Sequence, residues 1–115
     1  MKTFTATFSN GSGPYNIYNV ITGQQIGGVT PSTGQALWPT GTSIITGYLR
    51  IRNEKTNVGN IRIGDSSVNI SNFIGYPIDA GGEFQRDAQG NTNAESLNFW
   101  MAVTDNAQRV TIMWE

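Results

Sequence analysis

The sequence contains neither cysteine nor histidine, and each absence excludes a group of mechanisms. Without cysteine the chain can form no disulfide, no thiolate zinc site and no thiol nucleophile. Without histidine it cannot assemble a Ser-His-Asp triad. Charged residues make up 13% of the chain, which is about half the share of a typical globular domain. The side chains that most enzymes use are scarce, so we expect a protein that is not an enzyme and that carries no cofactor.

The charges that are present are balanced in sign. Seven basic and eight acidic residues give a formal net charge of −1, so the chain lacks the basic excess that binds nucleic acid or an anionic membrane. Residues 1–8 lack the unbroken apolar stretch of a signal peptide, and no later run approaches membrane-spanning length. We therefore expect synthesis in the cytoplasm, with neither nucleic acid nor membrane as a partner.

Hydroxyl, amide and glycine residues replace the missing charges, with 13 Thr, 12 Asn, 8 Ser and 14 Gly. Apolar residues among them recur with a period of two, which is typical of half-buried strands. The clearest examples are Phe4 to Phe8 and Val110 to Trp114, and Trp114 is predicted to lie in the core. Further strands are predicted at residues 15–21, 43–53, 60–64, 68–71 and 97–103. Residues 73–95 are predicted to be irregular, and no window shows a helical stripe of useful length.

About eight short strands, separated by turn residues, predict an all-β fold. We expect one domain, residues 1–115, built as an antiparallel β-sandwich of jelly-roll type. Residues 105–108 resemble a hairpin loop that joins the last two strands.

Three groups of side chains are candidates for chemistry. Four carboxylates cluster in sequence around the segment predicted to be irregular, but their spacing matches no Ca²⁺-binding pattern, and nothing marks two of them as an opposed glycosidase pair. We interpret them as solvated loop residues, and we predict no metal site. The residues are Asp65, Asp79, Glu83 and Asp87.

Aromatic side chains are the second group, because sugar-binding sandwiches use exposed rings as platforms. The candidates for such a platform are Trp38, Tyr48, Tyr76 and Trp100. Trp100 alternates with apolar neighbours and so belongs to the opposite strand face, which is equally typical of a ring covered by a loop or another subunit. An exposed aromatic face predicts a partner without distinguishing a glycan from a protein.

The third group is the only basic concentration in the chain. Arg50 and Arg52 share one strand face, and Arg62 is predicted to lie across from them, with Lys55 nearby. This is too little charge, with too few interleaved aromatics, for RNA or phosphate binding. Ion pairs at a subunit boundary or a solvated strand face are the better interpretations.

The second half of the chain resembles a pattern found in small structural proteins of tailed bacteriophages. In residues 52–68 an Asn/Thr/Gly turn leads into a strand that ends Ile-Gly-Asp-Ser-Ser-Val, and a Gly-Tyr-Pro-Ile segment with a later Glu follows at 75–83. Residues 110–115 resemble the closing strand of that pattern. Two departures are Val58, where Thr or Ser is common, and one extra residue between the proline and the glutamate. Within this pattern Gly64 is expected to let the strand end sharply, and Asp65 to accept backbone hydrogen bonds from the following turn.

The resemblance covers roughly residues 50–115 and implies a virion component. The small size favours a capsid decoration (cement) protein, whose expected partners on the capsid surface are the major capsid protein and further copies of itself. A carbohydrate-binding module and a small tail or connector component are the alternatives. The pool expected to contain interface residues is Phe4, Phe8, Trp38, Tyr48, Arg50 and Trp100.

Overall fold

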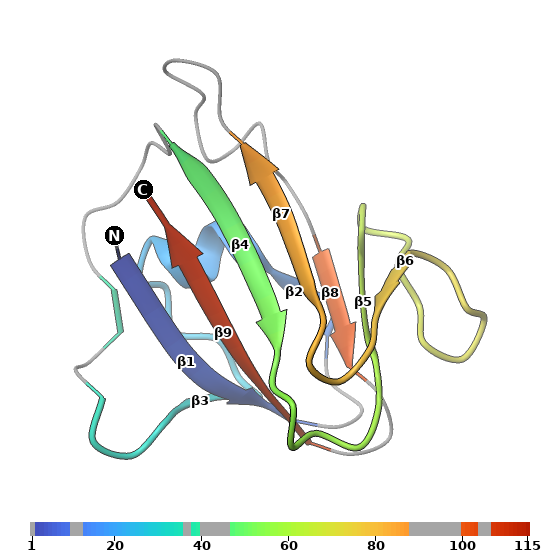
Figure 1. Ribbon diagram of the computed structural model, residues 1–115, viewed down its shortest axis with the longest axis horizontal. Helices are drawn as coiled ribbons and strands as arrows, with labels where there is room; N and C mark the ends of the chain where they lie inside the picture. Colours follow the sequence, from blue (N-terminus) through green and yellow to red (C-terminus); the bar gives the residue numbers. More distant parts are fainter. Residues whose placement is uncertain (1, 10–12, 36–37, 40–46, 88–99, 104–106) are drawn as a thin grey trace.

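Two antiparallel sheets form the protein, whose computed structural model describes residues 2–9, 13–35, 38–39, 47–87, 100–103 and 107–115 (Figure 1). The five-stranded sheet, in spatial order, comprises β3 (Val29–Pro31), β1 (Lys2–Phe8), β9 (Gln108–Trp114), β4 (Tyr48–Asn53) and β7 (Glu83–Asp87). The four-stranded sheet comprises β2 (Tyr15–Asn16), β8 (Trp100–Val103), β5 (Ile61–Gly64) and β6 (Tyr76–Ile78). One short helix, α1 (Ile17–Ile21), follows β2.

The strand pairs are nested, as in a long hairpin that has been rolled up. The pairs β1–β9, β2–β8, β4–β7 and β5–β6 enclose one another along the chain, and every pair is antiparallel. Rolling this ribbon brings β9 beside β4 and β8 beside β5, which completes the two sheets. This winding is that of a jelly roll, so the predicted fold class is confirmed. β3 is an additional strand, at the edge of the larger sheet.

The core lies between the sheets and is filled by the alternating residues of each strand. From the larger sheet the inward side chains include Phe4, Ala6 and Phe8 of β1, and the predicted core residue Trp114 of β9. The facing sheet contributes, among others, Ile61, Ile63, Ile78, Met101 and Val103. The period-two pattern therefore predicted the buried face of the described strands correctly. Residues 43–46 and 97–99 of two predicted strands lie outside the described residues.

Residues 15–21, predicted as a strand, are a strand only at Tyr15–Asn16, because a helix begins at Ile17. The side chain of Asn16 accepts a hydrogen bond from the Asn19 N–H at 3.1 Å, which caps the first turn. Ile17, Val20 and Ile21 are buried, at the spacing of one helical face. Burial of that face outweighs the strand preference of β-branched residues. None of the helices in the described ranges is both long and apolar enough to cross a membrane.

Three further strand predictions were wrong. Residues 68–71 contain only a single bridge, from Asn69 to Ile74, instead of a strand. The segment predicted to be irregular, residues 73–95, contains β6 and β7, which are edge strands whose polar residues and Pro77 hide the apolar alternation; its residues 88–95 lie outside the described residues. The last two strands do not form a hairpin, because β8 and β9 belong to different sheets; residues 105–106 of the predicted loop lie outside the described residues.

Asn53, at the end of β4, is a fully buried polar residue that links the two sheets. Its side-chain amide donates to the carbonyl oxygens of Gly59 and Ile78, both at 2.9 Å. Its side-chain oxygen accepts a hydrogen bond from Asn57, and Asn57 also pairs with the backbone of Arg109 in β9. One side chain therefore fixes the β4–β5 turn and positions β6 relative to the larger sheet.

Replacing Asn53 with Ala removes a donor from two carbonyls in the interior. We expect a loss of about 2–3 kcal/mol in the free energy of unfolding, because buried carbonyls are left without partners. Denaturant titration followed by tryptophan fluorescence measures this loss. Asn60→Ala is the matched control, since Asn60 makes only an exposed 3.3 Å bond to Asp79. Equal stability of the two variants would contradict the assigned role of Asn53.

Candidate functional site

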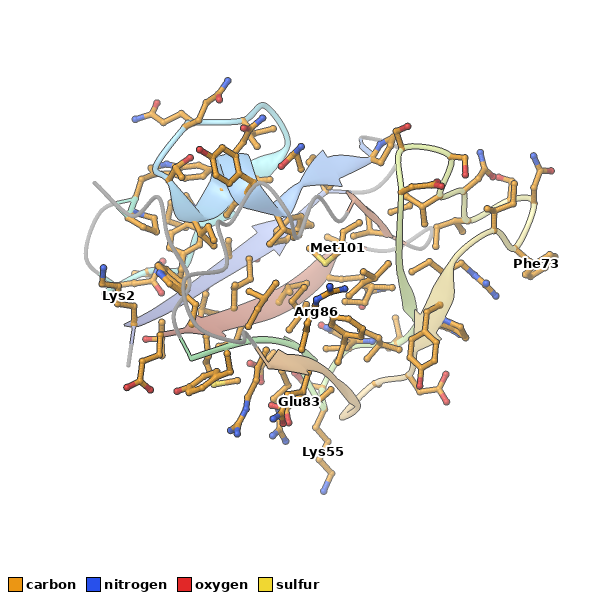
Figure 2. All side chains as sticks on the ribbon, turned by 90° about the horizontal axis from the view of Figure 1, so that it is seen from above. Lys2, Lys55, Phe73, Glu83, Arg86 and Met101 are labelled. Carbon is orange, nitrogen blue, oxygen red and sulfur yellow. The ribbon has the colours of Figure 1, made fainter. Side chains whose placement is uncertain are left out.

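The connection between β5 and β6 is the end of the rolled ribbon, and it extends beyond the sheets (Figure 1). Large apolar side chains are exposed here: Phe73 is 75% exposed, Tyr76 62% and Ile74 43%. Figure 2 shows Phe73 at the end of this loop, away from the body of the sandwich. Elsewhere in the described part of the chain, Val58 is the one other large apolar residue that is exposed to a similar degree. We call residues 65–76 the apical loop.

Asp65 and Ser67 organise the beginning of the apical loop. The Asp65 carboxylate accepts hydrogen bonds from the Ser67 hydroxyl and from the Ser67 N–H, the latter at 2.8 Å. These two bonds, the hydroxyl first, hold the pKa of Asp65 below its usual value of 3.8. Val68 then turns inward and is buried. The expectation that Asp65 accepts backbone hydrogen bonds from this turn is confirmed.

A tight turn closes the apical loop at its tip. The backbones of Asn69 and Ile74 exchange two hydrogen bonds of 3.0 and 2.9 Å, and the Asn69 side chain accepts one from the Asn72 N–H at 2.8 Å. The four residues between Asn69 and Ile74 must therefore reverse the chain. Phe73 completes the reversal with a φ of 58°, the only positive φ of a non-glycine residue among the described positions.

A phenylalanine in this left-handed conformation costs roughly 1–2 kcal/mol relative to glycine. The local structure holds it there through Arg62 of β5. The guanidinium donates to the carbonyl oxygens of Phe73 and Gly75 at 2.9 and 2.8 Å, and it lies 5.4 Å from the Phe73 ring centroid. The backbone strain and the anchoring arginine together keep an aromatic ring in solvent. Stability alone does not favour this arrangement.

Gly75 is the glycine on which the loop geometry depends. Its φ is +113°, and a Cβ atom would lie 2.5 Å from Cγ2 of Val68. Gly64, predicted to permit a sharp strand end, is the last residue of β5, and a Cβ there would come no closer than 3.6 Å to the backbone of Gly75. β5 therefore ends where the sequence predicted, while the glycine that needs a left-handed conformation is Gly75, at the return of the loop.

Tyr76 connects the apical loop to the larger sheet. Its ring lies 6.3 Å from that of Phe84 in β7, centroid to centroid. The contact joins the edge strands β6 and β7 across the open side of the sandwich, so the base of the loop is packed while its tip is exposed.

The predicted interface pool does not gather on one surface. Phe4 and Phe8 are 1% and 0% exposed, so in this fold they are core residues and offer no contact surface. Trp38 is half-buried and packs against Phe4 in a tilted arrangement, with the two ring centroids 5.2 Å apart. Tyr48 and Arg50 lie together on the outer face of the larger sheet, with the guanidinium 4.6 Å above the ring. The backbone of Trp100 is in β8, but its side chain lies outside what the structure describes.

The other predicted clusters are also dispersed. Arg62 does not lie across from Arg50 and Arg52, because the β4–β5 turn carries the chain from one sheet to the other. Asp65 is bonded to Ser67, and Asp79 accepts a bond from Asn60, while the side chain of Asp87 lies outside the described residues. Among the residues that the structure describes, no three carboxylates are grouped in a way that could hold a metal ion.

Comparison with protein-family models, with curated proteins and with solved structures finds no match to this chain. The resemblance to bacteriophage structural proteins therefore stays a prediction. The geometry of the apical loop is the main ground on which a function can be argued.

Sequence reasoning missed Phe73 and Ile74. The available signal was a pair of large apolar residues in an otherwise polar turn, Ile-Ser-Asn-Phe-Ile-Gly at residues 70–75. In a loop whose residues otherwise favour turns, such a pair either packs into the core or lies exposed, where a partner can contact it. Only the fold shows which of these two positions the pair takes.

Replacing Phe73 with Gly is expected to raise the free energy of unfolding by about 0.5–1 kcal/mol, because glycine adopts the left-handed conformation without strain. Phe73→Ala keeps the strain while losing the ring, so it serves as the reference. Denaturant titrations of both variants measure the difference. A Gly variant that is less stable than the Ala variant would show that φ strain is not stored at this position.

Replacing Ser67 with Ala is expected to raise the pKa of Asp65 toward 3.8, because the Ser67 hydroxyl makes the hydrogen bond that lowers this pKa most. The folded pKa is depressed, so this contribution to stability is complete above pH 3.8 and is lost as the pH falls through the folded pKa. An NMR titration of the Asp65 carboxyl measures the shift. If Ser66→Ala, the control, had the same effect, the assigned hydrogen bond would be wrong.

Proposed function

We propose that the protein is a structural protein of a tailed-bacteriophage virion, of the capsid decoration type, and that it contacts the shell through the apical loop. The observation that carries the proposal is Phe73. This ring is three-quarters exposed on a strained backbone, at the farthest point of a hydrogen-bonded loop.

The composition of the apical loop favours a protein as its partner. Aromatic residues and arginine dominate the hot spots of protein interfaces, and the apical loop exposes Phe73 and Tyr76, with the guanidinium of Arg62 from β5 lying over the Phe73 ring. The loop is ordered by its own hydrogen bonds, so little conformational entropy is lost when it binds. A pre-formed apolar tip of this kind suits insertion into an apolar pocket of a partner.

The sequence resemblance supports the class of partner. It spans roughly residues 50–115 and includes β5, the beginning of the apical loop and β6. Decoration proteins act by adding contact area to an assembled shell. In this proposal Phe73 contacts the major capsid protein. A standard interface buries about 800 Å² on each partner, more than one loop tip supplies, so flanking surfaces must contribute as well.

The proposal is tested with shells assembled without this protein. The purified chain should bind them saturably and raise their resistance to heat. Phe73→Gly should weaken binding about thirtyfold, as expected for a lost hot-spot contact of about 2 kcal/mol, although that variant is predicted to fold at least as stably as the wild type. Co-sedimentation at increasing protein concentration measures the affinity.

Val58→Ser is the matched control, because Val58 is as exposed as Phe73 and lies in a different loop. It should bind as the wild type does. Saturable binding that is equal for the two variants would show that the apical loop is not the contact. Binding to tails or connectors in place of shells would identify a tail or connector component and contradict the decoration role.

A further inference from the structure

A second surface lies on the opposite sheet from the apical loop. The outer face of β1, β3 and β9 is hollowed into an open groove of about 650 Å³, whose walls include Thr5, Thr7, Thr30, Gln35, Glu54 and Arg109. β5 and β6, the strands that carry the apical loop, belong to the other sheet and contribute no residue to the groove. The groove can therefore be tested separately from the proposed shell contact.

Hydrogen bonds fix which groups of the groove donate and which accept. Thr111 donates its hydroxyl proton to Oε1 of Glu54 at 2.6 Å, because a carboxylate can only accept. The 2.9 Å contact between the Thr5 and Thr111 hydroxyls must then run from Thr5 to Thr111. The proton of Thr5 is engaged in this contact, so its oxygen is left as an acceptor.

Two charged groups of the groove keep unused hydrogen-bonding capacity. The backbone of Arg109 is held by Asn57 and Glu54, but its guanidinium has no hydrogen bond or ion pair with a described residue. The second carboxylate oxygen of Glu54 has no partner among the described residues either. The groove thus offers free acceptors beside free donors, on a rigid sheet.

Gln35 contributes to the wall rather than to ligand binding. Its side-chain oxygen accepts from the Thr5 N–H, and its amide donates to the Thr5 carbonyl at 3.0 Å. The side chain thereby acts as an extra strand residue beside β1, past the point where β3 ends. This pairing keeps Thr5 in position, so the groove is pre-formed.

The chemistry of the groove selects the class of ligand. Glu54 and Arg109, whose backbones are hydrogen-bonded to each other, leave the groove without net charge, so neither an anion nor a cation is favoured by both, and an apolar protein patch would remove both charges from water. A neutral ligand rich in hydroxyls can form hydrogen bonds with both charged groups, since it donates to the Glu54 and Thr5 oxygens and accepts from Arg109. We propose that the groove binds a neutral oligosaccharide.

No aromatic residue lines the groove among the described positions, so a sugar ring gains no stacking energy there. The affinity of one site is therefore expected to be weak, with a dissociation constant on the order of 1 mM. The site does not depend on the proposed shell contact. If the chain does coat a shell in many copies, weak sites in a lattice would together bind a glycan-covered surface far more tightly.

The test is an amide NMR titration of the isolated chain with maltotriose, cellotriose and chitotriose. At least one sugar should cause saturable shifts at Thr5, Thr7 and Arg109. Glu54→Gln replaces one acceptor oxygen with a donor and should weaken binding about tenfold, the effect expected for one charge-assisted hydrogen bond. Glu83→Gln is the matched control, because this exposed carboxylate lies on β7 in the same sheet and outside the groove.

Several results would overturn the proposal. These are no saturable shift with any of the three sugars, shifts centred on Tyr48 or Tyr76 instead of the groove, or equal weakening by the two glutamine variants. Tighter binding of digalacturonate than of the neutral sugars would show an anion site governed by Arg109. Loss of shell binding in Phe73→Gly has no bearing on this titration, so the failure of one proposal is distinguishable from the failure of the other.

Discussion

The side chain of Asn53 is the constraint on which both candidate surfaces depend. It is buried at the end of β4, and it donates to Gly59 and Ile78, so it fixes where the chain leaves one sheet and where β6 returns in the other. β6 is the return strand of the apical loop. Through Asn57 the same network holds the backbone of Arg109 beside Glu54, on the wall of the groove. Leaving a buried polar group without a partner costs free energy, and the partners that Asn53 takes specify the register of the turns.

The buried faces of the strands could be predicted from the sequence, because alternation survives wherever one face of a strand meets the core. Phe4 to Phe8 and Val110 to Trp114 show this most clearly. The helix at Ile17–Ile21 could not be predicted, since four of its five residues carry strand-forming side chains and the decisive contacts are a cap and a distant core. Edge strands were missed for the opposite reason: β6 and β7 have polar or proline residues where alternation would reveal them. Which strands share a sheet is a property of the winding, and the local pattern does not encode it.

The candidate site was predictable only in part. The turn at Asp65 and Ser67 follows from local hydrogen-bonding preferences, and it forms as expected. The exposed ring of Phe73 depends on a left-handed residue at the loop closure and on Arg62 from a neighbouring strand, and sequence spacing reports neither. The predicted aromatics Phe4 and Phe8 show the same limit, because apolar residues are placed in the core or on a contact surface by the fold as a whole. Aromatic content predicted a partner, while the fold indicates which ring is available to it.

The central claim is that the tip of the apical loop contacts another protein. The most direct measurement replaces Phe73, or Val58 as a control, with the photoreactive p-benzoylphenylalanine, and irradiates shells that have bound the chain. Mass spectrometry then identifies the cross-linked partner. The account predicts a cross-link from position 73 to one shell protein and none from position 58. Shells that hold the chain but give no cross-link from position 73, or that cross-link equally from both positions, would contradict it.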